Sequence, residues 1–125
     1  MIARRVQLAL SVLALSAIAG CGPHFDHLDF IERTTPPMTV SLLSTGVSIP
    51  EGIAVAFTPL AMDGSTRMED AQVDLVTSDD GVLGLDRAED EGFVMYGVHP
   101  GHANISIFVD GEAVGTLPAS VTPQL

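Results

Sequence analysis

The stretch Gly92-Phe93-Val94-Met95-Tyr96-Gly97-Val98-His99-Pro100-Gly101-His102-Ala103-Asn104-Ile105-Ser106-Ile107 consists of two apolar-rich runs on either side of a Pro-Gly pair. The second run alternates polar and apolar residues, and a period of two is typical of a strand with one buried face. The Pro-Gly pair favours a turn, because proline fixes φ and glycine accepts conformations that other residues avoid. The stretch therefore predicts two consecutive strands joined by a short turn.

The same pattern recurs along the rest of the chain. Clusters that favour turns separate the apolar runs, and Asp110-Gly111 before Ala113-Val114 predicts a tight hairpin. No segment after residue 38 has the 3.6-residue apolar period of a helix. The sequence therefore predicts an all-β sandwich of about seven short strands over residues 38–125. The clearest further strand candidates are residues 38–42, 53–58, 73–77 and 82–85.

The run Leu75-Val76-Thr77-Ser78-Asp79-Asp80-Gly81-Val82-Leu83-Gly84-Leu85-Asp86 resembles the central signature of bacterial immunoglobulin-like (Ig-like) domains of the Big type. Residues 92–107 are similar to the signature that follows it in that family, and Pro50-Glu51-Gly52 is similar to the turn before its second strand. The resemblance covers residues 38–121. It implies a single Ig-like β-sandwich.

The chain departs from this family at its central aromatic residue. The position where the family usually has Trp is occupied by Leu75, which provides much less area to the core. We therefore expect other aromatic side chains to fill the space, and the candidates are Phe57, Tyr96 and Phe108.

The N-terminus has the organisation of an export signal. Arg4 and Arg5 precede an almost wholly apolar segment, residues 6–18. This segment is shorter than the roughly 20 apolar residues that a membrane-spanning helix needs, so a permanent transmembrane anchor is the weaker interpretation. Residues 1–20 are expected to be a signal peptide that is cleaved.

The end of this segment, Ile18-Ala19-Gly20-Cys21, resembles the bacterial lipobox. The resemblance implies cleavage between Gly20 and Cys21, a diacylglyceryl group on the Cys21 thiol and a further acyl chain, such as palmitate, on its amino group. Several acyl chains give stable membrane attachment where one does not. The alternative is an ordinary secretory signal that leaves Cys21 as a free thiol. In the lipoproteins that this motif resembles, an Asp after the lipidated cysteine is a signal for retention in the inner membrane. This chain has Gly22 at that position, so the resemblance implies the outer membrane of a Gram-negative cell envelope.

Residues 21–37 are expected to be a lipidated, flexible tether. Prolines stand near both of its ends, at Pro23 and at Pro36-Pro37, and proline favours extended chain. Apolar residues within it also leave open a docking segment. His24 and His27, with two aspartates nearby, could hold zinc or copper, although histidines in a tether are more often solvated.

The charge is strongly negative after Cys21. All 16 acids lie there, against three strong bases (Arg33, Arg67 and Arg87), which gives a net charge of −13, and the chain has no lysine. Nucleic acid is excluded as a partner because no basic surface exists to displace its counterions. Cations and basic proteins are the electrostatic partners that this charge permits. The acids could equally serve only to keep the domain soluble.

The sequence shows no persuasive catalytic set, and we expect no enzyme. The single cysteine is assigned to lipid, the absence of lysine excludes Ser–Lys chemistry, and no Gly-x-Ser-x-Gly motif occurs. No cofactor is expected apart from calcium, which prefers oxygen ligands. The candidate calcium ligands lie in two loops that flank the strand predicted at residues 82–85, and they are Asp79, Asp80, Asp86, Glu89, Asp90 and Glu91.

Two functions follow from these observations. The first is a lipid-anchored envelope protein whose Ig-like domain is a structural or adhesion-type module, binding an envelope or extracellular protein or glycan through loops or an edge strand. The alternative is a calcium-dependent adhesive or sensing domain that uses the acidic loops around residues 79–91.

Overall fold

The computed structural model describes residues 24–89 and 92–124, and in these residues the chain forms ten strands and no helix. The signal peptide, Gly20, Cys21, Asp90 and Glu91 lie outside the described residues. The strands are β1 (His27–Glu32), β2 (Ser41–Leu43), β3 (Gly46–Pro50), β4 (Ala54–Asp63), β5 (Thr66–Arg67), β6 (Val73–Thr77), β7 (Leu83–Arg87), β8 (Phe93–Gly97), β9 (Gly101–Val109) and β10 (Glu112–Thr122).

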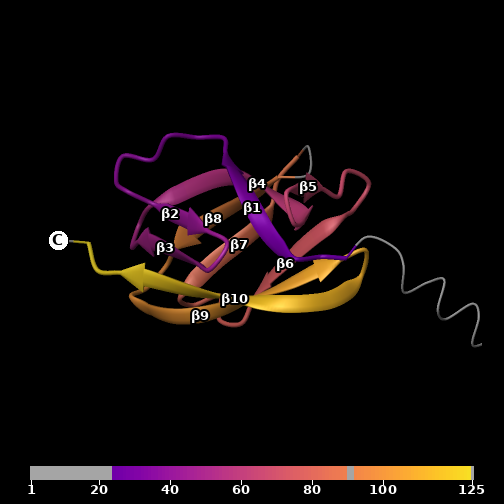
Figure 1. Ribbon diagram of the computed structural model, residues 1–125. Coiled ribbons are helices and arrows are strands. Elements are labelled where there is room, and N and C mark those ends of the chain that lie inside the picture. Colours follow the sequence, from indigo (N-terminus) through magenta and orange to yellow (C-terminus); the bar gives the residue numbers. More distant parts are fainter. Residues whose placement is uncertain (1–23, 90–91, 125) are drawn as a thin grey trace, which may run out of the picture.

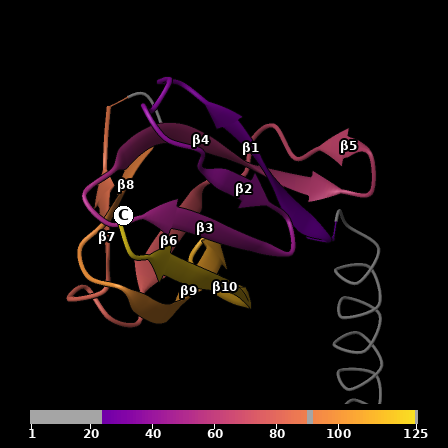
Figure 2. The same ribbon diagram turned by 90° about the vertical axis from the view of Figure 1, so that its left-hand side faces the viewer.

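The strands form two sheets packed face to face (Figures 1 and 2). One sheet has the order β1-β4-β8-β7, with β5 also paired to β4, and the other has the order β2-β3-β10-β9-β6. All named pairs are antiparallel except β3 with β10. Two five-stranded sheets that pack face to face with almost wholly antiparallel pairing are consistent with an Ig-like sandwich, so the predicted fold class is confirmed.

The quoted stretch forms β8 and β9 at the centre of the molecule. Phe93 and Met95 are buried on the inner face of β8, whereas Tyr96 points outward and is 36% exposed. On β9 the alternation places Ala103, Ile105 and Ile107 inside, as a period of two requires.

The β9–β10 hairpin confirms the predicted tight turn. Asp110 and Gly111 have φ values of 51° and 83°. Positive φ at two successive residues is the geometry that Asp-Gly supplies in a two-residue hairpin.

The core is completed by phenylalanines rather than by one large ring. Phe57 stacks on Phe93 with ring centroids 6.1 Å apart, and Phe30 contacts Phe57 edge-on at 5.5 Å. The prediction was therefore right for Phe57. It was wrong for Tyr96, which points outward, and Phe108 is only half-buried on β9.

The tether prediction is wrong for residues 27–32, which form β1. This strand pairs with β4 over six residues, from His27 opposite Met62 to Glu32 opposite Phe57. Leu28 is 1% exposed, so the strand contributes to the core. The apolar residues at 25, 28 and 30 explain the docking, because their burial favours a sheet position over a solvated chain.

Residues 33–40 carry the chain from the first sheet to the second. Pro36 and Pro37 lie in this crossing, where their missing N–H groups cost no ladder hydrogen bond. The edge of the sandwich is consequently split into β1 on one sheet and β2–β3 on the other. This split, together with the two-residue β5, accounts for ten strands where about seven were predicted.

The first described residues and the C-terminus lie at opposite ends of the sandwich (Figure 1). We call the end at which β1 begins the proximal end, and it includes the β4–β5 turn and the β9–β10 turn. We call the other end the distal end, and it includes the β3–β4, β6–β7 and β8–β9 turns.

Candidate functional site

Four of the six predicted calcium ligands, Asp79, Asp80, Asp86 and Glu89, lie in the described residues, and they are spread along both ends of β7. Asp79 and Asp80 lie in the turn before β7, and Glu89 lies in the turn after it. A strand of five residues rises about 3.3 Å per residue, so roughly 13 Å of chain separates the two turns. Among the described residues, no group of three or more His, Cys, Asp or Glu side chains is arranged to hold a metal ion.

Asp79 stabilises the turn in which it lies through hydrogen bonds to the backbone. Its carboxylate accepts a hydrogen bond from the Gly81 N–H at 3.0 Å, and its carbonyl accepts one from the Leu83 N–H at 3.0 Å. An aspartate that bonds the backbone two residues later is the usual way in which such turns are stabilised. This role is structural.

Two of the predicted acids, Asp80 and Asp86, do meet in a shallow groove on one side of the sandwich. The groove lies where the last strands of the two sheets, β6 and β7, approach each other. We call it the β6–β7 groove. Its lining is Leu75, Val76, Thr77, Ser78, Asp80, Gly84, Leu85, Asp86 and Tyr96.

Tyr96 forms one wall of the β6–β7 groove and lies flat across Gly84. The two residues are paired between β8 and β7, and a Cβ atom placed on Gly84 would be only 2.0 Å from the Tyr96 ring. Only glycine leaves room for this contact, because any larger residue would push the ring away. The ring therefore crosses β7 and reaches the free edge of its sheet.

Two carboxylates act on the Tyr96 hydroxyl. The negative charge of Asp86 raises the pKa of Tyr96, and the hydrogen bond between Asp86 and the hydroxyl raises it further, with smaller contributions from partial burial and from Asp80. Both carboxylates disfavour the phenolate because like charges repel. The groove thus presents an aromatic face beside two negative charges.

The groove is closed at its proximal side by an ion pair. Arg87 Nη2 lies 2.9 Å from Asp74 Oδ1, and the Arg87 guanidinium also lies over the Phe93 ring, 5.2 Å from its centroid. Asp74 Oδ1 additionally accepts a hydrogen bond from the Leu75 N–H at 3.0 Å. These contacts join β6 to β7.

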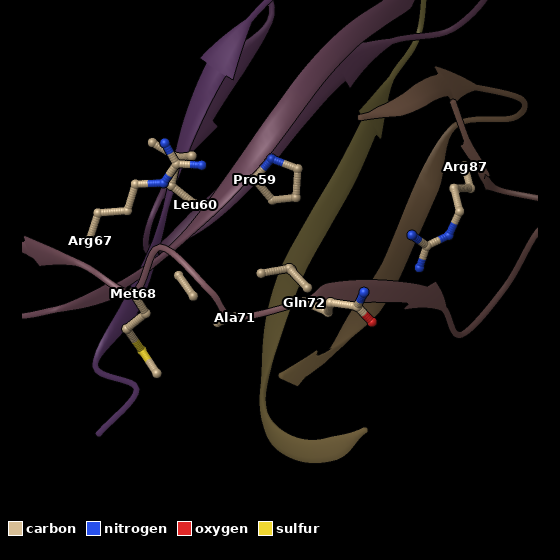
Figure 3. A pocket seen from close by; sticks show the side chains of 9 residues that line it. Pro59, Leu60, Arg67, Met68, Ala71, Gln72 and Arg87 are labelled. Atoms are coloured by element: carbon tan, nitrogen blue, oxygen red, sulfur yellow. The ribbon is translucent and has the colours of Figure 1, made fainter. Parts of the chain in front are cut away.

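A second pocket lies behind this ion pair, between β4 and the segment from Arg67 to Val73 (Figure 3). Its volume of about 50 Å³ is small beside the roughly 300–1,000 Å³ of ligand pockets. Figure 3 shows Arg67 and Arg87 on opposite sides of it, so their charges do not converge. The pocket is a packing gap with room for a few waters.

The histidines do not gather either. His27 lies between two carboxylates, with Nδ1 2.9 Å from Asp26 and Nε2 3.4 Å from Asp29. His99 Nδ1 is 4.0 Å from Glu51 at the distal end. The zinc or copper hypothesis for His24 and His27 gains no third ligand among the described residues.

Sequence reasoning missed the two residues that shape the groove. Tyr96 was expected among the aromatic residues that fill the core, and Gly84 was not singled out within its predicted strand. The period of two places Tyr96 on the face opposite Phe93 and Met95, but residues 93–96 are apolar throughout, so no polar/apolar alternation indicated which face is buried.

Comparison with known proteins gives a likeness of fold. No family model matches the chain, and no curated protein is similar enough in sequence to show a common family. Among solved structures, domains 4 and 5 of the S-layer protein SbsC match with a TM-score of 0.51 and 18% identity, over 75% of this chain and 54% of that one. The structure of the surface layer protein SbsC, domains 1–6, matches with a TM-score of 0.55 and 16% identity, over 83% of this chain and 14% of that one.

The chain therefore corresponds to about half, or less, of the structures that it matches, and at this identity the likeness shows the fold alone. Within residues 24–89 and 92–124, no helix has the length and apolar character needed to cross a bilayer.

Proposed function

We propose that the chain is a lipid-anchored protein of the cell envelope that presents one Ig-like sandwich as a non-catalytic interaction module. The observation that carries the proposal is the sandwich, whose fold is like that of domains of a surface-layer protein. The lipobox-like sequence Ile18-Ala19-Gly20-Cys21 supports the anchor. The module would bind a protein or glycan partner of the envelope or its surroundings.

The connection between the anchor and the domain is short. The His24 N–H lies 3.3 Å from Asp63 Oδ2, and the Asp26 N–H donates to the Met62 carbonyl at 2.7 Å, so the sandwich already holds the chain at residue 24. Three residues of fully extended chain span at most about 11 Å. A lipid on Cys21 would thus hold the proximal end close to the membrane surface.

The outer membrane of a Gram-negative cell is the address that Gly22 supports in this proposal. The strongly negative domain would gain no attraction from anionic headgroups, so the acyl chains would supply the membrane affinity.

The anchor is tested by growing cells with radiolabelled palmitate and fractionating their membranes. The wild-type chain is expected to carry the label and to leave the membrane with detergent but not with salt. A Cys21→Ala variant is expected to carry no label, whether or not its signal peptide is retained. Label that persists in the Cys21→Ala variant, or a wild-type chain without label, would contradict the proposal.

A further inference from the structure

We propose that the β6–β7 groove binds an extended, basic segment of a partner protein, which pairs with the free edge of β7. The inference rests on the proposed function, because it names the surface and the partner chemistry of the interaction module.

The edge of β7 is open. In the described residues β7 is the last strand of its sheet, so one side of it has no neighbouring strand. The Val98 N–H donates to Val82 O at 2.9 Å, and the Ala88 N–H donates to Gly92 O at 2.8 Å. Hydrogen-bonded positions alternate along an antiparallel pair of strands. The backbone N–H and C=O groups of Gly84 and Asp86 therefore point toward β8, and those of Leu85 point away from β8, into the groove.

The facing edge of β6 is occupied at its centre. The Asp110 N–H donates to Gln72 O and the Ser78 N–H donates to Asn104 O, so by the same alternation Leu75 points its backbone toward the groove. Its N–H is already bonded to the side chain of Asp74, which Arg87 holds in place. The central N–H of the β6 edge is thus taken, whereas among the described residues no such bond occupies the N–H of Leu85, so an incoming strand would pair with β7 in preference to β6.

The side chains flanking this edge specify an alternating partner. Residues of an added strand opposite Gly84 and Asp86 would lie on the outer face, beside the Tyr96 ring and the Asp86 carboxylate. A lysine or arginine there gains both a cation–π contact and a charged hydrogen bond. The residue between them, opposite Leu85, would point inward toward Leu85 and Leu75, where an apolar side chain fits.

Charge complementarity identifies the partner as another protein. Among the residues that the structure describes, no basic side chain lines the groove, which holds two carboxylates. A second copy of this chain does not fit, because after Cys21 it has only Arg33, Arg67 and Arg87 and no two bases two residues apart. A neutral glycan would leave both carboxylates without a charged partner.

The test uses the full chain purified in detergent and a labelled nine-residue peptide of alternating Arg and Val with blocked ends. Binding is measured by fluorescence anisotropy at physiological salt, where surface attraction over more than about 8 Å is screened. A second peptide has the same composition but places all its Arg before all its Val. The alternating peptide is expected to bind at least about tenfold more tightly, because only it matches the two faces of the edge.

Two variants locate the binding. Gly84→Ala is expected to push the Tyr96 ring off β7 and to weaken binding about tenfold, through loss of the cation–π surface. Gly115→Ala is the matched control, because nothing lies within 4 Å of the added Cβ, and it is expected to leave affinity unchanged. Asp86→Asn is expected to weaken binding by a similar factor without removing the ring.

Equal affinity for the two peptides would overturn the proposal, because it would mean general attraction to an acidic protein. So would equal effects of Gly84→Ala and Gly115→Ala. Peptide binding does not depend on lipid, and palmitate labelling does not depend on the groove. Failure of this inference and failure of the proposed anchor are therefore distinguished.

Discussion

The Tyr96 ring can lie across β7 only because its cross-strand neighbour, Gly84, has no side chain. The ring covers Gly84, and the nearby Asp86 carboxylate raises the pKa of the Tyr96 hydroxyl. Tyr96 is also the only tyrosine in a chain without tryptophan, so its ultraviolet absorbance can be followed without interference. The pKa of the Tyr96 hydroxyl can therefore be measured directly, and it reports on the carboxylates around it in the groove.

Replacing Asp86 with Asn is expected to lower the pKa of Tyr96 toward its ordinary value near 10, because the carboxylate that disfavours the phenolate is removed. The midpoint is measured by phenolate absorbance. Asp70→Asn, at an exposed position outside the groove, is expected to leave it unchanged. An unchanged midpoint in Asp86→Asn would show that the two side chains do not interact.

The raised pKa of Tyr96 also predicts the direction of a stability change in strong base. The folded chain holds the Tyr96 proton to a higher pH than the unfolded chain does. The contribution of Tyr96 to the free energy of unfolding is therefore fully present below the pKa that the tyrosine has in the unfolded chain. It is lost as the pH rises through the pKa of Tyr96 in the folded chain.

At the scale of strands, the structure differs most from the sequence prediction at β1, which was expected to be part of a tether. The sequence indicated the strands that alternate strictly, such as β9, and the Asp110-Gly111 turn, because period and turn chemistry are local signals. It did not indicate β1, because the prolines after it resemble the end of a tether and because pairing with β4 is a contact distant in sequence. The groove was missed for the same reason, since Gly84 and Tyr96 meet only through strand pairing.

Leu28→Ala tests whether β1 belongs to the fold. Leu28 is 1% exposed, so removing its side chain is expected to reduce the free energy of unfolding by about 2–5 kcal/mol, measured by urea denaturation. Ile31→Ala on the same strand is the control, because Ile31 is 50% exposed, and a loss of less than about 0.5 kcal/mol is expected. Small and equal effects of the two substitutions would mean that residues 27–32 belong to the tether and do not contribute to the core.

The two acidic turns predict the response to calcium. Because β7 separates Asp79 and Asp80 from Glu89, we expect millimolar Ca²⁺ and Mg²⁺ to change the melting temperature equally and little. Thermal denaturation with each ion measures this. A rise with Ca²⁺ that Mg²⁺ does not reproduce would support the calcium-dependent alternative.

At the scale of the whole molecule, the short connection predicts an orientation. A lipid on Cys21 would place the proximal end, with the β4–β5 turn, beside the bilayer and the distal end, with the β6–β7 turn, away from it. Fluorophores are attached to Ser65→Cys and Asp80→Cys in lipidated protein on vesicles that carry a headgroup quencher. We expect stronger quenching at residue 65. Equal quenching at the two positions would mean that the domain tumbles freely on its anchor.

The central claim is that Cys21 joins this sandwich to a membrane, and the intact mass of the chain recovered from membranes tests it most directly. We expect a chain that begins at Cys21 and carries the added mass of a diacylglyceryl group and an amide-linked acyl chain. A chain that begins elsewhere, or that begins at Cys21 with an unmodified thiol, would contradict it.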